Sequence, residues 1–130
     1  MPAPTRRVAV QGARGEGVIP LPEGDEVTVL YTNRALVEAE TALGKPILVA
    51  VQAMAEGAIA VGDVVQLLLV GMRAARRDAR TSGAVPTVAD AYDIMDQVGL
   101  TSVTAIVIEA VAAVLSYGQN TDAADQDPNA

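Results

Sequence analysis

The chain has 130 residues, of which 51% are hydrophobic, and its formal net charge at pH 7 is −7. It contains no cysteine and no histidine, which excludes disulfides, thiolate chemistry and the most common zinc ligands, and removes the most common general base. We therefore expect no enzymatic activity, no cofactor and no metal. The length indicates one domain, and its core must use small and branched side chains because phenylalanine and tryptophan are absent.

The two ends of the chain differ from its middle in charge and composition. Residues 1–16 are expected to form a flexible basic arm, because Arg6, Arg7 and Arg14 lie among prolines and glycines. Residues 118–130 are polar and acidic and are expected to be disordered. Between them, residues 17–117 are predicted to form a single domain that combines a hairpin with a helical bundle.

Two β-favouring runs open this domain, at residues 18–21 and 26–31. They flank a turn of Pro, Glu, Gly and Asp at residues 22–25, and this arrangement predicts a β-hairpin. In the second run Val27, Val29 and Tyr31 share one face, because side chains alternate along a strand.

Helical signals fill the rest of the domain. Thr32 or Asn33 is expected to cap the first helix and Gly44 to end it, while Thr87 and Asp90 resemble a capping box for the fourth. The expected ranges are 34–43, 45–57, 61–80, 87–98 and 101–117, the last capped by Thr101 or Ser102. Since the links are short, the expected fold is mainly α (α+β), with an N-terminal β-hairpin followed by a compact bundle of four or five short helices.

Two of these helices are apolar on nearly every side. A surface helix normally has one apolar stripe, and a small domain has little interior in which to cover two all-apolar helices. Either neighbouring helices of the same chain cover the extra apolar faces, or another protein does. We expect a protein partner or a second copy, bound through the residues outside the stripes: Leu67, Leu69 and Val70 on helix 61–80, and Ile108, Ala112 and Leu115 on helix 101–117.

The apolar stretches do not predict a membrane span. A span needs about twenty mostly apolar residues, whereas Arg73 ends the first stretch and Glu109 interrupts the second. The N-terminus also lacks the hydrophobic stretch of a secretory signal. We therefore expect a cytoplasmic protein with no membrane contact.

A cluster of arginines lies at the end of helix 61–80. Arg73, Arg76, Arg77 and Arg80 are spaced i, i+3, i+4 and i+7 and therefore project from one face. They form either a patch for phosphate or an acidic partner, or a solvated last turn in which cations oppose the helix dipole. We favour the solvated turn, and the negative net charge and missing aromatic platform argue against nucleic acid. A small DNA-binding regulator is an alternative that this patch leaves open.

Helix 87–98 has the opposite charge. Asp90, Asp93 and Asp96 follow an i, i+3 spacing and share one side. Consecutive positions on a helix diverge too much to form a cage around a cation, so we interpret this side as a solvated acidic face.

One family resemblance rests on the first helix and on the order of the elements. Residues 35–44 contain the pattern Leu-x-x-x-Glu-x-x-x-Gly, formed by Leu36, Glu40 and Gly44. A short β segment leads directly into this helix, and a small helix, a Leu/Val-rich helix, an acidic helix and a closing apolar helix follow. Over residues 17–117 the chain resembles the tail assembly chaperones of long-tailed bacteriophages, especially their relatives in gene-transfer-agent clusters.

The resemblance implies a chaperone without catalytic residues, and together with the extra apolar surface it leads us to expect a homo-oligomer in the host cytoplasm. Such a chaperone coats the tape measure protein before the tail tube polymerises around it, and its contact with a helical client would pack helix against helix. The alternative is a structural virion subunit, such as a head–tail connector or another tail component, in which the basic arm and the acidic tail bridge neighbours in a ring.

Overall fold

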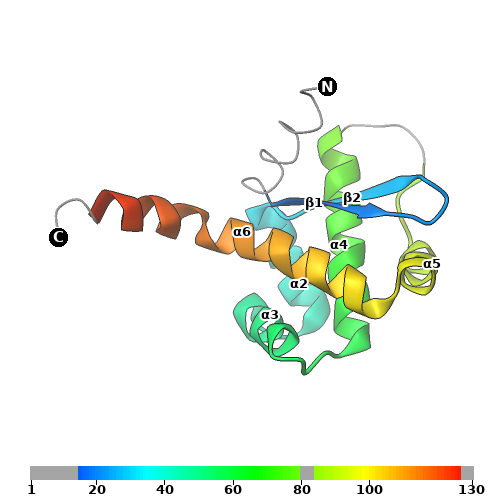
Figure 1. Cartoon of the computed structure of the whole chain (residues 1–130), viewed down its shortest axis with the longest axis horizontal. Helices are drawn as coiled ribbons and strands as arrows, with labels where there is room; N and C mark the ends of the chain where they lie inside the picture. The colour runs from blue at the N-terminus through cyan, green and yellow to red at the C-terminus, as the bar shows by residue number, and fades with distance from the viewer. Residues whose placement is uncertain (1–14, 80–83, 127–130) are drawn as a thin grey trace.

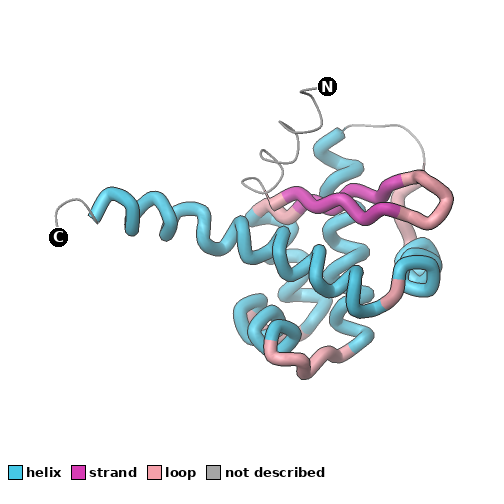
Figure 2. Tube along the Cα trace, viewed as in Figure 1, coloured by secondary structure: helices cyan, strands magenta, loops and turns pink. Residues whose placement is uncertain are grey.

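The computed structural model describes residues 15–79 and 84–126, with side chains given up to Ser116. Over these ranges the fold is mainly α, as predicted, with a two-stranded hairpin followed by five helices (Figures 1 and 2). The elements are β1 (Glu16–Pro20), β2 (Glu26–Leu30), α2 (Asn33–Leu43), α3 (Ile47–Ala55), α4 (Val61–Ala79), α5 (Val88–Val98) and α6 (Leu100–Gln126). The predicted arm lies outside the described residues except at its last two positions, where Glu16 already begins β1.

The hairpin packs one face onto the helices. β1 and β2 are antiparallel, with Gly17 opposite Val29 and Ile19 opposite Val27. Val29 and Ile19 are fully buried, because β2 lies on α4 and β1 lies on α6. At Gly17 an added Cβ would stand only 3.1 Å from the Ile106 Cγ2 of α6. A glycine here therefore lets the hairpin approach α6 closely.

Helix α4 lies at the centre of the bundle. It contacts β2, α2, α5 and α6, and Figure 1 shows it running through the middle of the molecule behind the hairpin and α6. The side chains that fill its surroundings come from every one of these elements, and among the described side chains Tyr31 supplies the one aromatic ring of the core.

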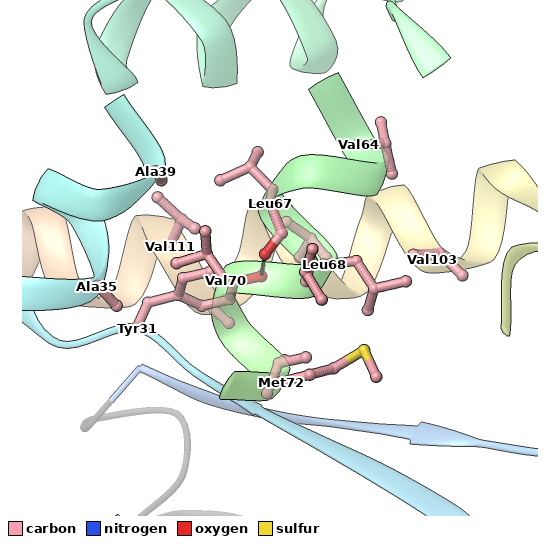
Figure 3. Close-up of a cluster of buried hydrophobic side chains, with 14 of the residues drawn as sticks. Tyr31, Ala35, Ala39, Val64, Leu67, Leu68, Val70, Met72, Val103 and Val111 are labelled. Atoms are coloured by element: carbon pink, nitrogen blue, oxygen red, sulfur yellow. Dashed lines mark hydrogen bonds between the residues drawn. The ribbon is translucent and has the colours of Figure 1, made fainter. Parts of the chain in front are cut away.

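Tyr31 joins the hairpin to α4. Its hydroxyl donates a 2.7 Å hydrogen bond to the carbonyl oxygen of Leu67, and Figure 3 shows the ring reaching from the end of β2 to the backbone of α4. This approach requires Gly71, where an added Cβ would stand 2.5 Å from the Tyr31 hydroxyl oxygen and 2.9 Å from the Val29 Cβ. Complete burial of the phenol raises the pKa of Tyr31 far above its ordinary value.

Local capping signals set most of the helix boundaries. Thr32 caps α2 by accepting a hydrogen bond from the Ala35 N–H, and Gly44 ends it in the left-handed conformation. Thr87 and Asp90 form the predicted capping box of α5, since the Thr87 N–H donates to the Asp90 carboxylate and the Thr87 hydroxyl accepts from the Asp90 N–H. These predictions are confirmed.

Helix α6 differs from its prediction at both ends. It begins at Leu100, because the Gly99 carbonyl already accepts from the Val103 N–H, so neither Thr101 nor Ser102 is the cap. It also continues to Gln126, and residues 118–126, which we expected to be disordered, are therefore helical, while residues 127–130 lie outside the described ranges. In Figure 1 this last part of α6 projects beyond the bundle.

No single helix in the described ranges is long and apolar enough to span a membrane. Only α5 together with Leu100–Ser116 of α6 meets the length and composition of a span, and those two segments are bent by 114°.

Candidate functional site

The residues predicted to form a partner surface on α4 are buried within the bundle. Leu67, Leu69 and Val70 are 0%, 5% and 8% exposed, because the four elements around α4 cover every side of its central residues 67–72. We expected too little interior for this helix because the sequence does not reveal that it occupies the centre. These three side chains are therefore not accessible to a partner in this arrangement of the bundle.

The predicted surface on α6 is partly accessible. Ala112 is exposed, and Ile108 and Leu115 are half-buried and pack against the edge of the core. Their role in partner binding stays a prediction. On the buried side of the same helix, the hydroxyl of Thr104 has no hydrogen-bond partner among the described residues, although Thr104 is only 3% exposed.

An exposed apolar face that we did not predict lies on α3. Eight of the nine residues of α3 are apolar, the exception being Gln52. Ile47, Ala50, Val51 and Met54 are buried against the bundle, whereas Leu48 and Val49 are 61% and 54% exposed. A helix without a polar side leaves large apolar groups in water. We call Leu48 and Val49 the α3 face.

Two polar contacts fix the orientation of α3. The Glu40 carboxylate accepts a 2.9 Å hydrogen bond from the Ile47 N–H and so supplies the cap that Pro46, the residue at the N-cap position, cannot provide. Lys45 Nζ lies 2.8 Å from Asp63 Oδ2 and connects the start of α3 to the start of α4. These two contacts, together with the packing of α3 against α6, fix the side of the bundle on which the α3 face lies.

These contacts also explain the motif at residues 36–44. Leu36 is buried, Glu40 caps the next helix and Gly44 takes the left-handed conformation that ends α2. Each of the three residues therefore has a structural role, Leu36 in the core and Glu40 and Gly44 in the turn between α2 and α3.

The arginine patch takes part in contacts within the chain. Arg73 Nε donates a 2.9 Å hydrogen bond to the Pro86 carbonyl, and an Arg77 guanidinium nitrogen lies 3.4 Å from Glu38 of α2. Arg76 also has an interaction within the protein, and Arg80 lies outside the described residues. Arg73 positions the start of α5, and Arg77 connects α4 to α2.

Among the residues described, no group of three or more carboxylates is placed to hold a metal ion. Comparison of the chain with protein-family models, with curated proteins and with solved structures found no match. The candidate site therefore rests on the structure alone. It consists of the α3 face and the accessible side of α6, where Ala112 is exposed and Ile108 and Leu115 are half-buried.

Proposed function

We propose that this protein is a tail assembly chaperone of the bacteriophage and gene-transfer-agent type, which binds a tape measure protein through the α3 face and the accessible side of α6. The proposal is supported by the resemblance in element order and by the α3 face itself. Leu48 and Val49 are large, apolar and exposed on a helix that carries no charged residue. This exposure is the observation that carries the proposal.

A long helical client is a chemically suitable partner for such a face. Before it is enclosed, a coiled-coil protein exposes a continuous apolar stripe that promotes aggregation, and a small apolar helix can cover part of that stripe by helix-on-helix packing. Burying each large aliphatic side chain contributes about 1.5–3 kcal/mol. Several copies along one client would add their contributions through avidity.

The test has two steps: the neighbouring genes are searched for one that encodes a long coiled-coil protein, and that protein is co-expressed with this chain. The wild-type protein is expected to keep that client soluble and to co-purify with it. In the double variant Leu48→Asp/Val49→Asp, the amount of co-purified client should fall by at least about tenfold, since about 1.4 kcal/mol already gives that factor. Circular dichroism should show an unchanged helix content, because both side chains point into water.

Val37→Asp provides a matched control. Val37 is also exposed, but it lies on the outer side of α2, and its replacement should leave client binding unchanged. Equal binding by wild type and by the double variant would contradict the proposal, and so would the absence of any neighbouring gene for a long coiled-coil protein. Recovery of the protein from purified particles would instead favour the structural virion subunit.

A further inference from the structure

Helix α5 carries a second apolar face, separate from the α3 face. Its inner side buries Ala91, Ile94 and Met95, whereas Val88 and Tyr92, one turn apart on the outer side, are 38% and 54% exposed. We call Val88 and Tyr92, with the exposed Asp93 and Asp96 beside them, the α5 face.

The charged residues of α5 itself are all acidic, although Arg73 of the neighbouring α4 lies at its start, where it donates a hydrogen bond to the Pro86 carbonyl. From residue 84 to Ser116 the chain contains three aspartates and one glutamate and no lysine or arginine. Asp90 is engaged in the capping box, but Asp93 and Asp96 form no hydrogen bond or ion pair with any residue in the described ranges. The face therefore suits an occupant that brings apolar side chains together with cations.

The chain itself contains a segment of this composition. Residues 6–10 read Arg-Arg-Val-Ala-Val, and residues 1–14 contain three arginines and no acidic residue. Two guanidinium groups match the two free carboxylates, and the adjacent valines match Val88 and Tyr92. An arginine stacked on the ring of Tyr92 would add a cation–π contact.

The reach of the chain is sufficient for a contact within one molecule. Gly15 is fixed beside β2, because its carbonyl accepts a 2.9 Å hydrogen bond from the Tyr31 N–H. The start of β2 and Pro86, just before α5, border one hollow, so α5 begins near the turn end of the hairpin (Figure 1). Nine residue steps from Gly15 to Arg6 span up to about 30 Å, whereas a five-residue strand is only about 17 Å long.

We propose that residues 6–10 fold back along the hairpin and bind the α5 face of their own chain. The tether keeps the local concentration of the segment high, in the millimolar range for short flexible linkers, so the contact within one chain is favoured over the same contact between two chains. The segment covers Val88 and Tyr92 and neutralises Asp93 and Asp96.

The experiment uses the full chain with a nitroxide spin label at Ala9→Cys, which labels a single site because the protein has no native cysteine. At about 0.1 M salt we expect the label to broaden the amide NMR signals of residues 88–96. At about 1 M salt, where the Debye length falls from about 10 Å to about 3 Å, the broadening should decrease severalfold.

Charge-reversal variants test whether the broadening depends on pairing between the arginines of residues 6–10 and the aspartates of the α5 face. Asp93→Lys/Asp96→Lys should abolish it, and combining that pair with Arg6→Glu/Arg7→Glu should restore it, as a double-mutant cycle requires for paired charges. The control Glu56→Lys/Glu109→Lys changes the net charge equally at exposed sites on other elements and should leave the broadening unchanged.

Two results would overturn the proposal. One is the absence of broadening on α5 in the labelled wild-type background. The other is equal broadening in a mixture of labelled and isotope-enriched unlabelled chains, which would assign the contact to a second copy. Neither result depends on the client, so the outcome of this experiment is independent of the outcome of the client-binding experiment.

Discussion

Helices α4 and α6 are both apolar on nearly every side, but they occupy different surroundings. Helix α4 is enclosed by β2, α2, α5 and α6, whereas α6 buries one side and exposes Ala105, Glu109 and Ala112 on the other. The two helices differ in the size of the side chains that lie outside their main apolar stripe. Those of α4 are leucine and valine, and those on the outer side of α6 are mostly alanine, serine and threonine, which leave less apolar area in water.

The strongest test of this comparison replaces one residue in each helix by aspartate. Leu69→Asp places a charge without a partner in the core and removes a buried leucine, so we expect a loss of more than about 4 kcal/mol and a largely unfolded protein. Ala112→Asp on the outer side of α6 should cost less than about 1 kcal/mol. Urea denaturation followed by circular dichroism measures both.

Leu69→Ala extends the same test if the aspartate variant cannot be purified. Its expected cost is about 2–5 kcal/mol, the range for removing a buried leucine. Equal and small effects of the substitutions at Leu69 and Ala112 would contradict the enclosure of α4.

The second test addresses the close approach of the hairpin to α4. Gly71→Ala forces Tyr31 and Val29 away from the helix, and we expect a loss of about 2–3 kcal/mol. Gly62→Ala in the first turn of the same helix meets nothing within 4 Å and should stabilise the protein by about 0.5–1 kcal/mol, because alanine restricts the unfolded chain and favours helix. Thermal unfolding of the pair checks the difference in sign.

The third test concerns the hydrogen bond from Tyr31 to α4. Tyr31→Phe should cost about 1 kcal/mol near neutral pH. The wild-type protein should also lose up to about 1.4 kcal/mol per pH unit above about pH 10, because the unfolded chain releases the phenol proton there while the folded chain, in which burial raises the pKa of Tyr31, retains it. Below about pH 10 the phenol is protonated in both the folded and the unfolded chain, so this loss of stability does not occur. A Tyr31→Phe variant with the same alkaline slope would show that another group causes it.

The smallest expected effect is on the buried side of α6. Thr104→Val removes a hydroxyl that has no partner in the part of the chain that the structure describes and should raise the free energy of unfolding by up to about 1 kcal/mol. Thr101→Val, at an exposed position of the same helix, should change it by less than about 0.5 kcal/mol. Destabilisation by Thr104→Val would mean that the hydroxyl makes a hydrogen bond in solution.

Signals that act over a few residues predicted the fold well. The turn at residues 22–25, the cap at Thr32, the left-handed Gly44 and the capping box at Thr87 are all where the sequence places them. Each depends on neighbouring atoms along the chain, so the sequence contains the necessary information.

The surfaces were predicted less well because they depend on which elements meet in space. Nothing near Leu67 in the sequence indicates that four elements surround α4, and Gly71 is an ordinary helix glycine until Tyr31 is packed against it. The α3 face escaped notice because α3 is short, and a short apolar run looks like core in sequence. The end of α6 was misplaced because a polar composition indicates disorder, although alanine, glutamine and aspartate are also compatible with an exposed helix.

The length of α6 affects how the molecule moves through solvent. A helix of 27 residues is about 40 Å long, and its C-terminal part projects beyond the bundle in Figure 1. A rod that extends past a rounded body increases friction, so a single copy should sediment more slowly and elute earlier than a sphere of equal mass. Early elution from a sizing column would therefore be consistent with a monomer, and light scattering is the measurement that counts the copies.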